Sequence, residues 1–384
     1  MKIVKIKLYY NNSPFRIKFR SAQSSRTCSE SVIIQLDFEN GISAYGESSP
    51  RPYVTGEDRS SVVDLIKDFF ARILFAQEIN TINDVENVLD EIENECYRRD
   101  IHEYNSTLGA VDTALLDGLG KLNKVPVINF LGPIVRKKIF YSLTVPFLHL
   151  EYLQALLSEL EKDNLKYVKV LVGKCESENV NRVSSVRSIL GERVDIRIDA
   201  NQKWNLQEAI SNLNKLEQFN IAAVEQPVAK SDIGGLKSLK KAIEPPIIAD
   251  ESIRNLLDAK RLVEEEACDI FNIKISKCGG LLRSRKIARF ARSQNLLCQL
   301  GAHVGETEVL DAAGKHFAFT TPDLVYFERT PSMMFEDSSV NLQFEHKCES
   351  EDISFNIGLG VPSAPQQSIM RHCLHIVDLV AKQK

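Results

Sequence analysis

The chain has 384 residues and a mass of 43.3 kDa, which suffices for a large core and predicts about two domains. Apolar residues make up 43% of it and charged residues 26%, the balance of an ordinary globular protein. The net charge is only −4 and no basic stripe is present, so we expect no nucleic-acid partner. No stretch reaches the ~18 uninterrupted apolar residues of a membrane span, so we expect no membrane partner either.

Two features of the sequence predict a cytoplasmic protein. The eight cysteines include no Cys-x-x-Cys pair and no tight cluster with histidine, which favours reduced thiols over disulfides or a zinc site. The first residues, 1–5, carry charges among their apolar side chains and lack the continuous apolar core of a signal peptide.

The first 130 residues predict an α+β domain. Apolar residues alternate over 3–8, and a stronger apolar run covers 31–38, so both segments are expected to be strands. Three later segments place apolar residues three and four apart, as helices do: 58–76, 81–98 and 106–122. Strands followed by helices are typical of an α+β domain, which we place at residues 1–130.

From about residue 138 the pattern changes to short apolar runs that alternate with amphipathic segments. The runs predict eight strands, near 139–145, 166–172, 194–199, 221–225, 246–249, 269–274, 296–301 and 323–328. With helices between the strands, the ~25-residue spacing fits a (β/α) barrel at residues 131–330 better than an open doubly wound sheet. No Gly-x-Gly-x-x-Gly or Walker loop is present, which argues against a nucleotide site. Residues 331–384 are expected to be irregular, to finish with a helix and to pack back on the first domain.

Four residues at the ends of successive strands are predicted to carry the chemistry. Asp199, Glu225, Asp250 and Lys274 each end a short apolar run, at gaps of 26, 25 and 24 residues. Such gaps accommodate one strand, one helix and two loops, which places all four at the same end of parallel strands. Three converging carboxylates repel one another unless a cation neutralises them, and oxygen ligands favour Mg²⁺ over zinc. We therefore predict a magnesium site; the alternative is that each acid only caps the following helix.

Lys274 is predicted to be the base of this site. Its neighbours Asn272, Ile273 and Ile275 indicate that its stem is buried in the barrel mouth. Burial and a nearby cation both favour the neutral amine, which can accept a proton near pH 7. A salt bridge to one of the acids is the structural alternative. Lys277 lies past the strand, where phosphate, substrate and water are its candidate partners.

Further motifs accompany these residues over nearly the whole chain. They are Tyr45-Gly46-Glu47, the segment 53–57 (YVTGE), the segment 110–114 (AVDTA) with Asp117, the segment 277–280 (KCGG) and the segment 358–361 (GLGV). In this order, the full set resembles the enolase superfamily, and within it the muconate-lactonizing subgroup. That subgroup also contains dipeptide epimerases and o-succinylbenzoate synthases.

The resemblance implies a fold and a chemistry. The fold is a modified (β/α)8 barrel with an α+β N-terminal capping domain that the C-terminal tail completes. The chemistry is Mg²⁺-dependent abstraction of the proton α to a carboxylate, by an isomerase or lyase that acts on a small carboxylate substrate. The polar loops at 20–29 and 48–57, around Arg26 and Tyr53, would close over the site and help to set specificity. Since members generally assemble into dimers or octamers, the resemblance also implies a homo-oligomer.

One segment departs from the pattern of the subgroup. Members usually end the second barrel strand with Lys-x-Lys before a small apolar residue and glycine, whereas this chain has Lys169, Val170 and Leu171. Strand alternation places Lys169 and Leu171 on the same inward face, with Lys169 one layer deeper. Lys169 is therefore kept as a second candidate catalytic residue, while Leu171 cannot carry a proton. Lys174, past the glycine, is expected to face water.

The leucine at position 171 leaves the type of reaction open. A racemase or epimerase needs an acid on one face of the substrate and a base on the other, and only Lys274 is placed for this work. A one-base elimination or cycloisomerisation fits Lys274 alone, and Lys169 supports two-base chemistry only if the strand shifts or the substrate sits deeper. The alternatives are a dipeptide epimerase or related racemase of amino-acid derivatives, and a homologue that binds carboxylates without turnover.

Several further residues are candidates for substrate contacts. Glu328 ends the eighth strand, where members of the family it resembles often carry an acid that orients or protonates substrate; the alternative is an ion pair, for instance with Arg329. Asn201 follows the third strand and is a second candidate. Arg26 is expected either to bind a second carboxylate of the substrate or to be solvated. Tyr53 is the candidate from the second loop.

For two residues after the seventh strand a structural interpretation is favoured, while a role in the site stays open for both. Glu306 is expected to start a helix, where the macrodipole stabilises an acid. His303 is expected to be a surface or hydrogen-bonding residue.

Overall fold

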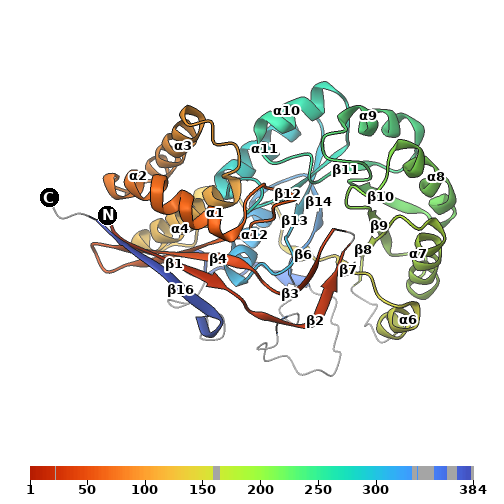
Figure 1. Cartoon of the computed structure of the whole chain (residues 1–384), viewed down its shortest axis with the longest axis horizontal. Coiled ribbons are helices and arrows are strands. Elements are labelled where there is room, and N and C mark those ends of the chain that lie inside the picture. Colours follow the sequence, from red (N-terminus) through yellow and green to blue (C-terminus); the bar gives the residue numbers. More distant parts are fainter. Residues whose placement is uncertain (22, 159–164, 331–334, 336–349, 361–369, 382–384) are drawn as a thin grey trace.

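The structure is a computed structural model that describes all residues except 22, 159–164, 331–334, 336–349, 361–369 and 382–384. A capping domain with a four-stranded antiparallel sheet lies beside a curled eight-stranded parallel sheet that is flanked by helices (Figure 1). This confirms the predicted fold class, while the residue bounds of the domains remain a prediction. Among the described residues, no helix is both long and apolar enough to cross a bilayer. Every cysteine that the structure describes is unpaired, and Cys348 lies outside the described residues.

The sheet of the capping domain joins the two ends of the chain. Its order is β16, β1, β4 and β5, which are formed by Cys373–Val380, Ile3–Asn11, Ser31–Phe38 and Ser43–Ser48. The tail thus returns to the first domain as expected, but the predicted final helix is wrong, because its residues form β16. Residues 373–380 are rich in β-branched side chains, and β1 offers them an open edge whose backbone groups need partners.

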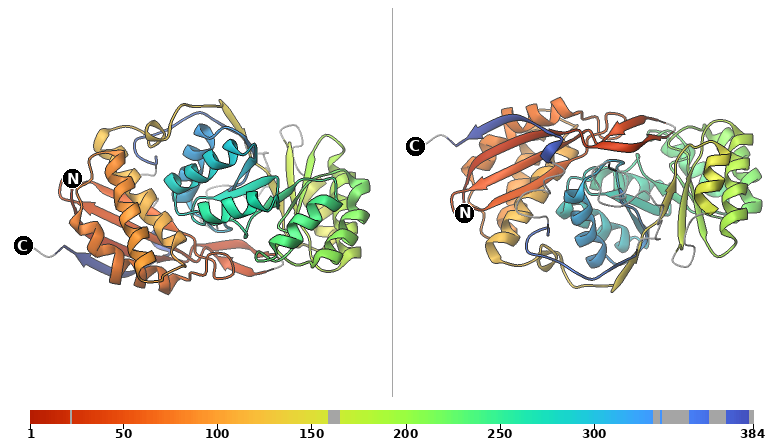
Figure 2. Two further views of the ribbon diagram at one scale, coloured as in Figure 1. Left: turned by 90° about the horizontal axis from the view of Figure 1, so that it is seen from above. Right: turned by 90° about the horizontal axis from the view of Figure 1, so that it is seen from below.

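A hairpin extends from this sheet toward the barrel. β2 (Pro14–Arg20) and β3 (Ser25–Cys28) pair antiparallel. In both Figure 1 and Figure 2 the hairpin reaches from the capping domain toward β7 and β8 of the barrel. The prediction of a loop at 20–29 is therefore wrong for residues 25–28, whose backbone pairs with β2.

The helices of the capping domain pack on one face of its sheet. They are α1 (Arg59–Leu65), a π-helical turn η1 (Ile66–Phe70), α2 (Ala71–Ala76), α3 (Ile82–Arg98) and α4 (Asn105–Asn123), and the short α5 (Ile128–Leu131) follows. α4 approaches β5 so closely that a Cβ built on Gly46 would lie 1.9 Å from the carbonyl oxygen of Ala110. This close approach requires the glycine of the Tyr-Gly-Glu motif.

The barrel strands follow one another in the sheet in chain order, all parallel. They are β7 (Leu143–Val145), β8 (Tyr167–Leu171), β9 (Asp195–Asp199), β10 (Ile221–Glu225), β11 (Ile247–Ala249), β12 (Ile270–Lys274), β13 (Leu297–Gly301) and β14 (Leu324–Phe327). The helices between them are α6 (Leu150–Ser158), α7 (Glu176–Leu190), α8 (Leu206–Leu216) with the 3-10 turn η3 (Glu217–Phe219), α9 (Ile233–Ala242), α10 (Leu256–Glu264), α11 (Leu281–Ser293) and α12 (Glu308–Thr320). A 2.8 Å hydrogen bond from Ser142 N to the Phe327 carbonyl joins the two edges, so the sheet curls back on itself.

The first predicted barrel strand, 139–145, consists of two strands with different partners. β6 (Lys138–Phe140) pairs antiparallel with β15 (Ser350–Asp352), and only β7 joins the barrel sheet. The partner of β6 lies about two hundred residues further along the chain, so the local pattern of apolar residues could not reveal the break.

Side chains fill the interior of the barrel below the carboxyl ends of its strands. Ala223, Ile248, Ile270 and Tyr326 form a small apolar cluster. The guanidinium of Arg197 is fully buried and lies 4.1 Å from the centre of the Tyr326 ring, at a distance suited to a cation–π contact. The packed interior leaves the carboxyl ends of the strands as the place for a ligand.

Buried carboxylates of the capping domain bind the amino ends of two barrel helices. Asp112 of α4 accepts hydrogen bonds from Leu281 N at 2.6 Å and Leu282 N at 3.2 Å, at the start of α11. Glu47 of β5 accepts one from Thr307 N at 3.0 Å, at the start of α12. The first N–H groups of a helix lack partners within it and lie at the positive end of its dipole, so these carboxylates join the two domains.

We expect Asp112→Ala to lower the free energy of unfolding by about 3 kcal/mol, because two buried amides lose their acceptor at a cost of about 1–3 kcal/mol each. Urea unfolding followed by circular dichroism would show this as a lower midpoint. Glu264→Ala, at the exposed end of α10, is the matched control and should change stability by less than about 0.5 kcal/mol. Equal midpoints for the two variants would contradict the proposed role of Asp112.

Candidate active site

The residues predicted to carry the chemistry gather at the carboxyl ends of the barrel strands. In the register of the sheet, Leu171 is paired with Asp199, and Asp199 with Glu225. Asp250 follows β11 directly, and Lys274 ends β12. All five side chains are buried. They lie at the same end of successive strands, as their spacing predicts, while their roles stay predictions.

Lys169 lies two residues before Leu171 on β8, one layer deeper in the barrel, and its amine contacts three carboxylates. Its Nζ lies 2.9 Å from Glu328 Oε2, 3.2 Å from Glu225 Oε1 and 3.5 Å from Asp199 Oδ2. Burial alone would lower the pKa of Lys169, but the charges of Glu225 and Glu328 outweigh burial and raise the pKa well above its ordinary value. Lys169 therefore holds these carboxylates together as a cation.

Glu225 has hydrogen-bond donors on both of its oxygens. Besides Lys169, Oε1 accepts a bond from Asn272 Nδ2 at 2.9 Å, and Oε2 accepts one from Gln299 Nε2 at 3.0 Å. The guanidinium of Arg197 lies 3.8 Å from Oε2. Full pairing explains how a carboxylate with no exposed surface can be accommodated.

Glu328 forms ion pairs, but its partners are not the neighbouring arginine. Arg197 Nη2 lies 3.1 Å from Glu328 Oε1, and Lys169 binds the other oxygen. Arg329 instead lies 3.7 Å from Asp311. Burial alone would raise the pKa of Glu328, but Lys169 and Arg197 outweigh it and lower the pKa, so the group is a charged part of the network.

Two lysines hold the two oxygens of Asp250. Lys274 Nζ lies 2.5 Å from Oδ2, and Lys277 Nζ lies 2.6 Å from Oδ1. Burial alone would raise the pKa of Asp250, but these two charges lower it below its usual range. Burial alone would likewise lower the pKa of Lys274, and the carboxylate of Asp250 raises it instead. The ion pair that sequence reasoning gave as the structural alternative for Lys274 is present, so a neutral amine requires another cation on Asp250.

Lys277 is more deeply buried than its position after the strand suggested. It has no exposed surface and also donates to the carbonyl oxygens of Asp250, at 2.6 Å, and of Asn272, at 2.8 Å. With three protein acceptors, Lys277 fixes Asp250 against β12. By contrast, Lys174 is exposed, as predicted.

The chemistry of the donor set fits a magnesium ion. Asn201 Oδ1 and Glu251 Oε2 are buried oxygens without a hydrogen-bond partner among the described residues. Asn201 lies two residues after Asp199, and Glu251 directly follows Asp250. Burial, with the charge of Glu225 adding, raises the pKa of Asp199 well above its usual range, because Lys169 does not fully offset the repulsion between Asp199 and Glu225. Oxygen donors and surplus negative charge suit Mg²⁺. In the described part of the chain no three acids, histidines or cysteines form a closed ligand set, since lysine amines lie between the carboxylates.

Gln23, in the turn between β2 and β3, contacts the barrel mouth. Its Nε2 donates to the Asn201 carbonyl at 2.8 Å and to Glu251 Oε1 at 3.1 Å. Burial, with the charge of Asp250 adding, raises the pKa of Glu251 to about 7. Sequence analysis singled out neither residue. The adjacency of Glu251 to Asp250 could have signalled it, whereas nothing local marks Gln23.

The other two loop candidates have different surroundings. Tyr53 is partly exposed, with its hydroxyl 3.4 Å from Ser24 Oγ. Lys230 of the barrel donates to the Tyr53 carbonyl at 3.1 Å and so fastens the second loop. Arg26 forms an ion pair with Glu30, between β3 and β4, rather than being solvated.

His303 and Glu306 lie in a buried loop after β13. His303 is 5% exposed, and its Nδ1 lies 2.9 Å from the carbonyl oxygen of Ser49. Glu306 accepts a 2.8 Å bond from His303 N, and burial, with Glu47 adding, raises the pKa of Glu306 to about 8. The prediction that Glu306 starts a helix is wrong, because α12 begins at Glu308 and Glu47 already binds its amides.

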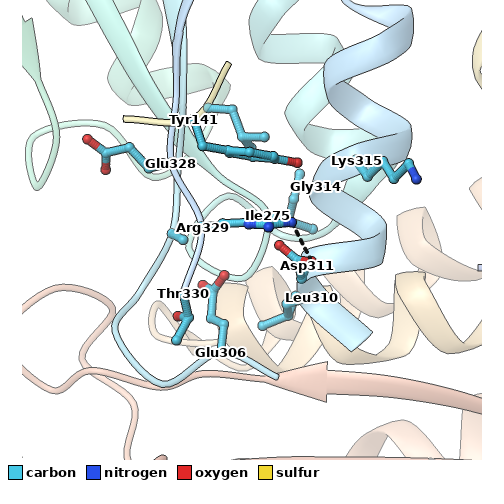
Figure 3. Close-up of a pocket in the computed structure, with 13 residues that line it drawn as sticks. Tyr141, Ile275, Glu306, Leu310, Asp311, Gly314, Lys315, Glu328, Arg329 and Thr330 are labelled. Carbon is cyan, nitrogen blue, oxygen red and sulfur yellow. Dashed lines mark ion pairs between the residues drawn. The ribbon is translucent and has the colours of Figure 1, made fainter. Parts of the chain in front are cut away.

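A small pocket lies beside this loop, between β13, β14 and α12 (Figure 3). Glu306 and Glu328 both line it, and the Glu328 carboxyl points away from the other labelled residues in Figure 3. On another side, the Arg329 guanidinium lies 4.4 Å from the centre of the Tyr141 ring and is held by Asp311. The pocket connects the carboxylate network with the loop of His303.

Known families match almost the whole sequence. Residues 3–132 match "Mandelate racemase / muconate lactonizing enzyme, N-terminal domain", and residues 152–366 match "Enolase C-terminal domain-like". The two matches cover most of the chain and leave out residues 133–151, which include β7, and residues 367–384, which include β16.

Three relatives extend this result. N-succinyl-L-Arg/Lys racemase of Bacillus cereus is 29% identical over 90% of this chain and 91% of its own, and its crystal structure has a TM-score of 0.89 with both chains covered to 100%. D-Ala-D/L-Ala epimerase of Cytophaga hutchinsonii is 30% identical over 88% of this chain and 90% of its own. A dipeptide epimerase from Cytophaga hutchinsonii, solved with Mg and the dipeptide D-Ala-L-Val, has a TM-score of 0.85 at 27% identity, over 98% of this chain and 99% of its own.

A further solved structure shows how widely the fold is shared. Muconate lactonizing enzyme from Pseudomonas putida has a TM-score of 0.84 over 97% of this chain and 100% of its own, at 21% identity, a likeness of fold alone. The two domain matches and the relatives that align over most of this chain indicate the same family. The strand-end acids and Lys274 are consistent with it. This chain belongs to the mandelate racemase/muconate lactonizing enzyme family of the enolase superfamily.

Proposed function

We propose that this protein is a Mg²⁺-dependent isomerase or lyase that removes the proton α to the carboxylate of a small amino-acid derivative, with Lys274 as the base. The observation that carries the proposal is the place of the Lys274 amine, buried at the carboxyl end of β12 beside Asp250. By their names, the relatives act on N-succinylated amino acids and on dipeptides, and both classes carry such a proton. A substrate of this kind fits a site that the loops of Gln23 and Tyr53 cover.

The residues of the site have separate tasks in this proposal. Asp199, Glu225 and Asp250 would hold Mg²⁺, which when bound supplies positive charge for the negative charge that develops on the substrate. Lys274 accepts the proton at Nζ. Lys169 fixes Glu225 and its neighbours, and remains the second candidate for proton transfer. The covering loops exclude water and bind the rest of the substrate.

A racemase or dipeptide epimerase is the second candidate. The similarity to the relatives above favours it, since their names are those of racemases and epimerases. Leu171 argues against an epimerase. Such an enzyme needs a second proton donor at the end of β8, which is four places from β12 in the sheet, and Leu171 occupies that position. Lys169 below it is bound to three carboxylates. One-base chemistry is therefore the form of the reaction that we favour.

Proton exchange in D₂O tests this proposal. The protein with Mg²⁺ is incubated with N-succinyl-lysine, N-succinyl-arginine and Ala-Glu, each in its separate stereoisomers. Proton NMR then follows the α-proton and any new product. We expect loss of the α-proton from one stereoisomer only. EDTA should abolish this exchange. Exchange from both stereoisomers would support the epimerase instead. No exchange or product across the panel would contradict both and favour a homologue that binds carboxylates without turnover.

A further inference from the structure

The imidazole of His303 has one bonded nitrogen and one without a partner. Nδ1 lies 2.9 Å from the carbonyl oxygen of Ser49, and since a carbonyl oxygen only accepts, Nδ1 carries the proton. Nε2 is fully buried and has no hydrogen-bond partner within the described residues. Burial, together with the charges of Lys274 and Arg51, keeps the pKa of His303 well below its usual value, so the ring is neutral. Nε2 therefore presents a lone pair that calls for a donor.

His303 lies in the loop that follows β13, the strand next to that of the candidate base Lys274. Lys274 is paired with Gly301 in the register of β12 and β13, and His303 follows two residues later. Ser49, which binds the ring through its carbonyl, also donates its own N–H to Ser276 Oγ at 2.9 Å. The same loop residue thus ties the imidazole to the segment that follows Lys274.

His303 does not replace the lysine that Leu171 displaces. β13 is the neighbour of β12 in the sheet, whereas β8 is four places away from β12. His303 and Lys274 therefore lie on the same side of the barrel, and the ring cannot deliver a proton to the opposite face of a substrate. Its role must concern a group that lies next to the carbon at which Lys274 acts.

We propose that His303 Nε2 accepts a hydrogen bond from the amide N–H that the substrate carries on the carbon deprotonated by Lys274. The site would thereby select α-acylamino acids and peptides over carboxylates that lack this N–H. The inference rests on the proposed function and adds a specificity-determining residue to it. A substrate with the N–H supplies the donor that the chain itself does not, and a substrate without it leaves a buried acceptor unpaired.

Two amide substitutions separate this role from a structural one. In His303→Asn, the short side chain retains a donor for the Ser49 carbonyl but has nothing at the position of Nε2. In His303→Gln, the longer side chain places an amide oxygen near the position of Nε2 and gives up the bond to Ser49. A role in catalysis predicts that Gln is the better replacement, and a role in loop structure predicts that Asn is.

The probe is a matched pair of ligands, N-succinyl-lysine and its N-methyl analogue, used with the Mg²⁺-loaded protein. For the wild type we expect kcat/KM of α-proton exchange to be at least about tenfold higher with the N–H compound. His303→Asn should lose most of this preference, and His303→Gln should keep it. An unchanged preference in His303→Asn would overturn the inference and leave the proposed function intact. Absence of exchange from every compound of the panel would instead refute the proposed function, and the inference with it.

A measurement on the wild type covers the case in which a variant fails to fold. In protein labelled with ¹⁵N-histidine, the unprotonated Nε2 resonance of the buried Nδ1–H tautomer should move upfield on binding of the N–H ligand. The N-methyl ligand should leave it in place. Binding of both ligands without a difference at this nitrogen would contradict the hydrogen bond.

Discussion

Replacing Lys274 by alanine should lower the rate of α-proton exchange by at least about a hundredfold, because general-base catalysis contributes about 10²–10⁴-fold and Lys274 is the proposed base. Lys169 and Lys277, the other lysines buried at this end of the barrel among the described residues, are each bound to acceptors of the protein. The rate is measured by proton NMR in D₂O with the best compound of the panel. Circular dichroism confirms that the variant is folded.

Lys274→Arg distinguishes a base from a mere counter-charge. Arginine keeps a positive charge near Asp250, but its pKa above about 12 prevents it from accepting a proton near neutral pH. We expect it to be as inactive as the alanine variant. Lys174→Ala is the control, since Lys174 is exposed past β8, and its rate should equal that of the wild type. Restoration of activity by arginine would show that Lys274 acts only through its charge on Asp250.

Replacing Leu171 by lysine should make the protein exchange the stereoisomer that the wild type leaves untouched. Leu171 is inward-facing, 3% exposed and paired with Asp199, so a lysine there reaches the site from the side opposite Lys274. With acid and base on the two faces, 1,1-proton transfer becomes possible. We expect exchange of the second stereoisomer to rise by at least about tenfold over the wild type, with interconversion of the two forms detected by chiral chromatography.

Leu171→Met is the matched control for this gain. Methionine has about the length of lysine, is tolerated in buried positions and cannot transfer a proton. It should leave the second stereoisomer untouched. If wild-type protein already interconverts both stereoisomers, a second proton donor must exist, and Lys169 would be the residue to test next.

The barrel could be predicted from the sequence because its signal is local and repeated. Each of its strands is a short apolar run, and the acids at 199, 225 and 250 mark their ends at nearly constant spacing. Parallel strands joined by helices must place such ends on one side, so the candidate ligands could be grouped without any contact being known. The closing pieces could not be predicted in this way. β6 and β16 take partners far along the chain, and an apolar run alone does not reveal its partner.

The site shows the same division between local and distant information. Lys274 and the strand-end acids follow from the strand pattern, whereas the contact of Gln23 with Asn201 and Glu251 joins residues that are about two hundred positions apart. His303 was expected to be a surface or hydrogen-bonding residue, and its burial depends on Ser49 of the capping domain. The ion pairs could not be predicted from sequence neighbours either. Glu328 binds Arg197, on a strand across the barrel, and not the adjacent Arg329.

The position of β1 between β4 and β16 bears on how the protein is made. The capping sheet takes one of its strands from residues 373–380, so during vectorial synthesis it stays incomplete until nearly the whole chain has left the ribosome. Until then β1 exposes an unpaired edge, which invites pairing with another chain. Its contacts with β16 span most of the polypeptide, and such long-range pairing is slow. Nascent chains that stop before residue 373 should therefore depend most on chaperones, whereas a circular permutant that places residues 373–380 ahead of β1 would complete the sheet earlier.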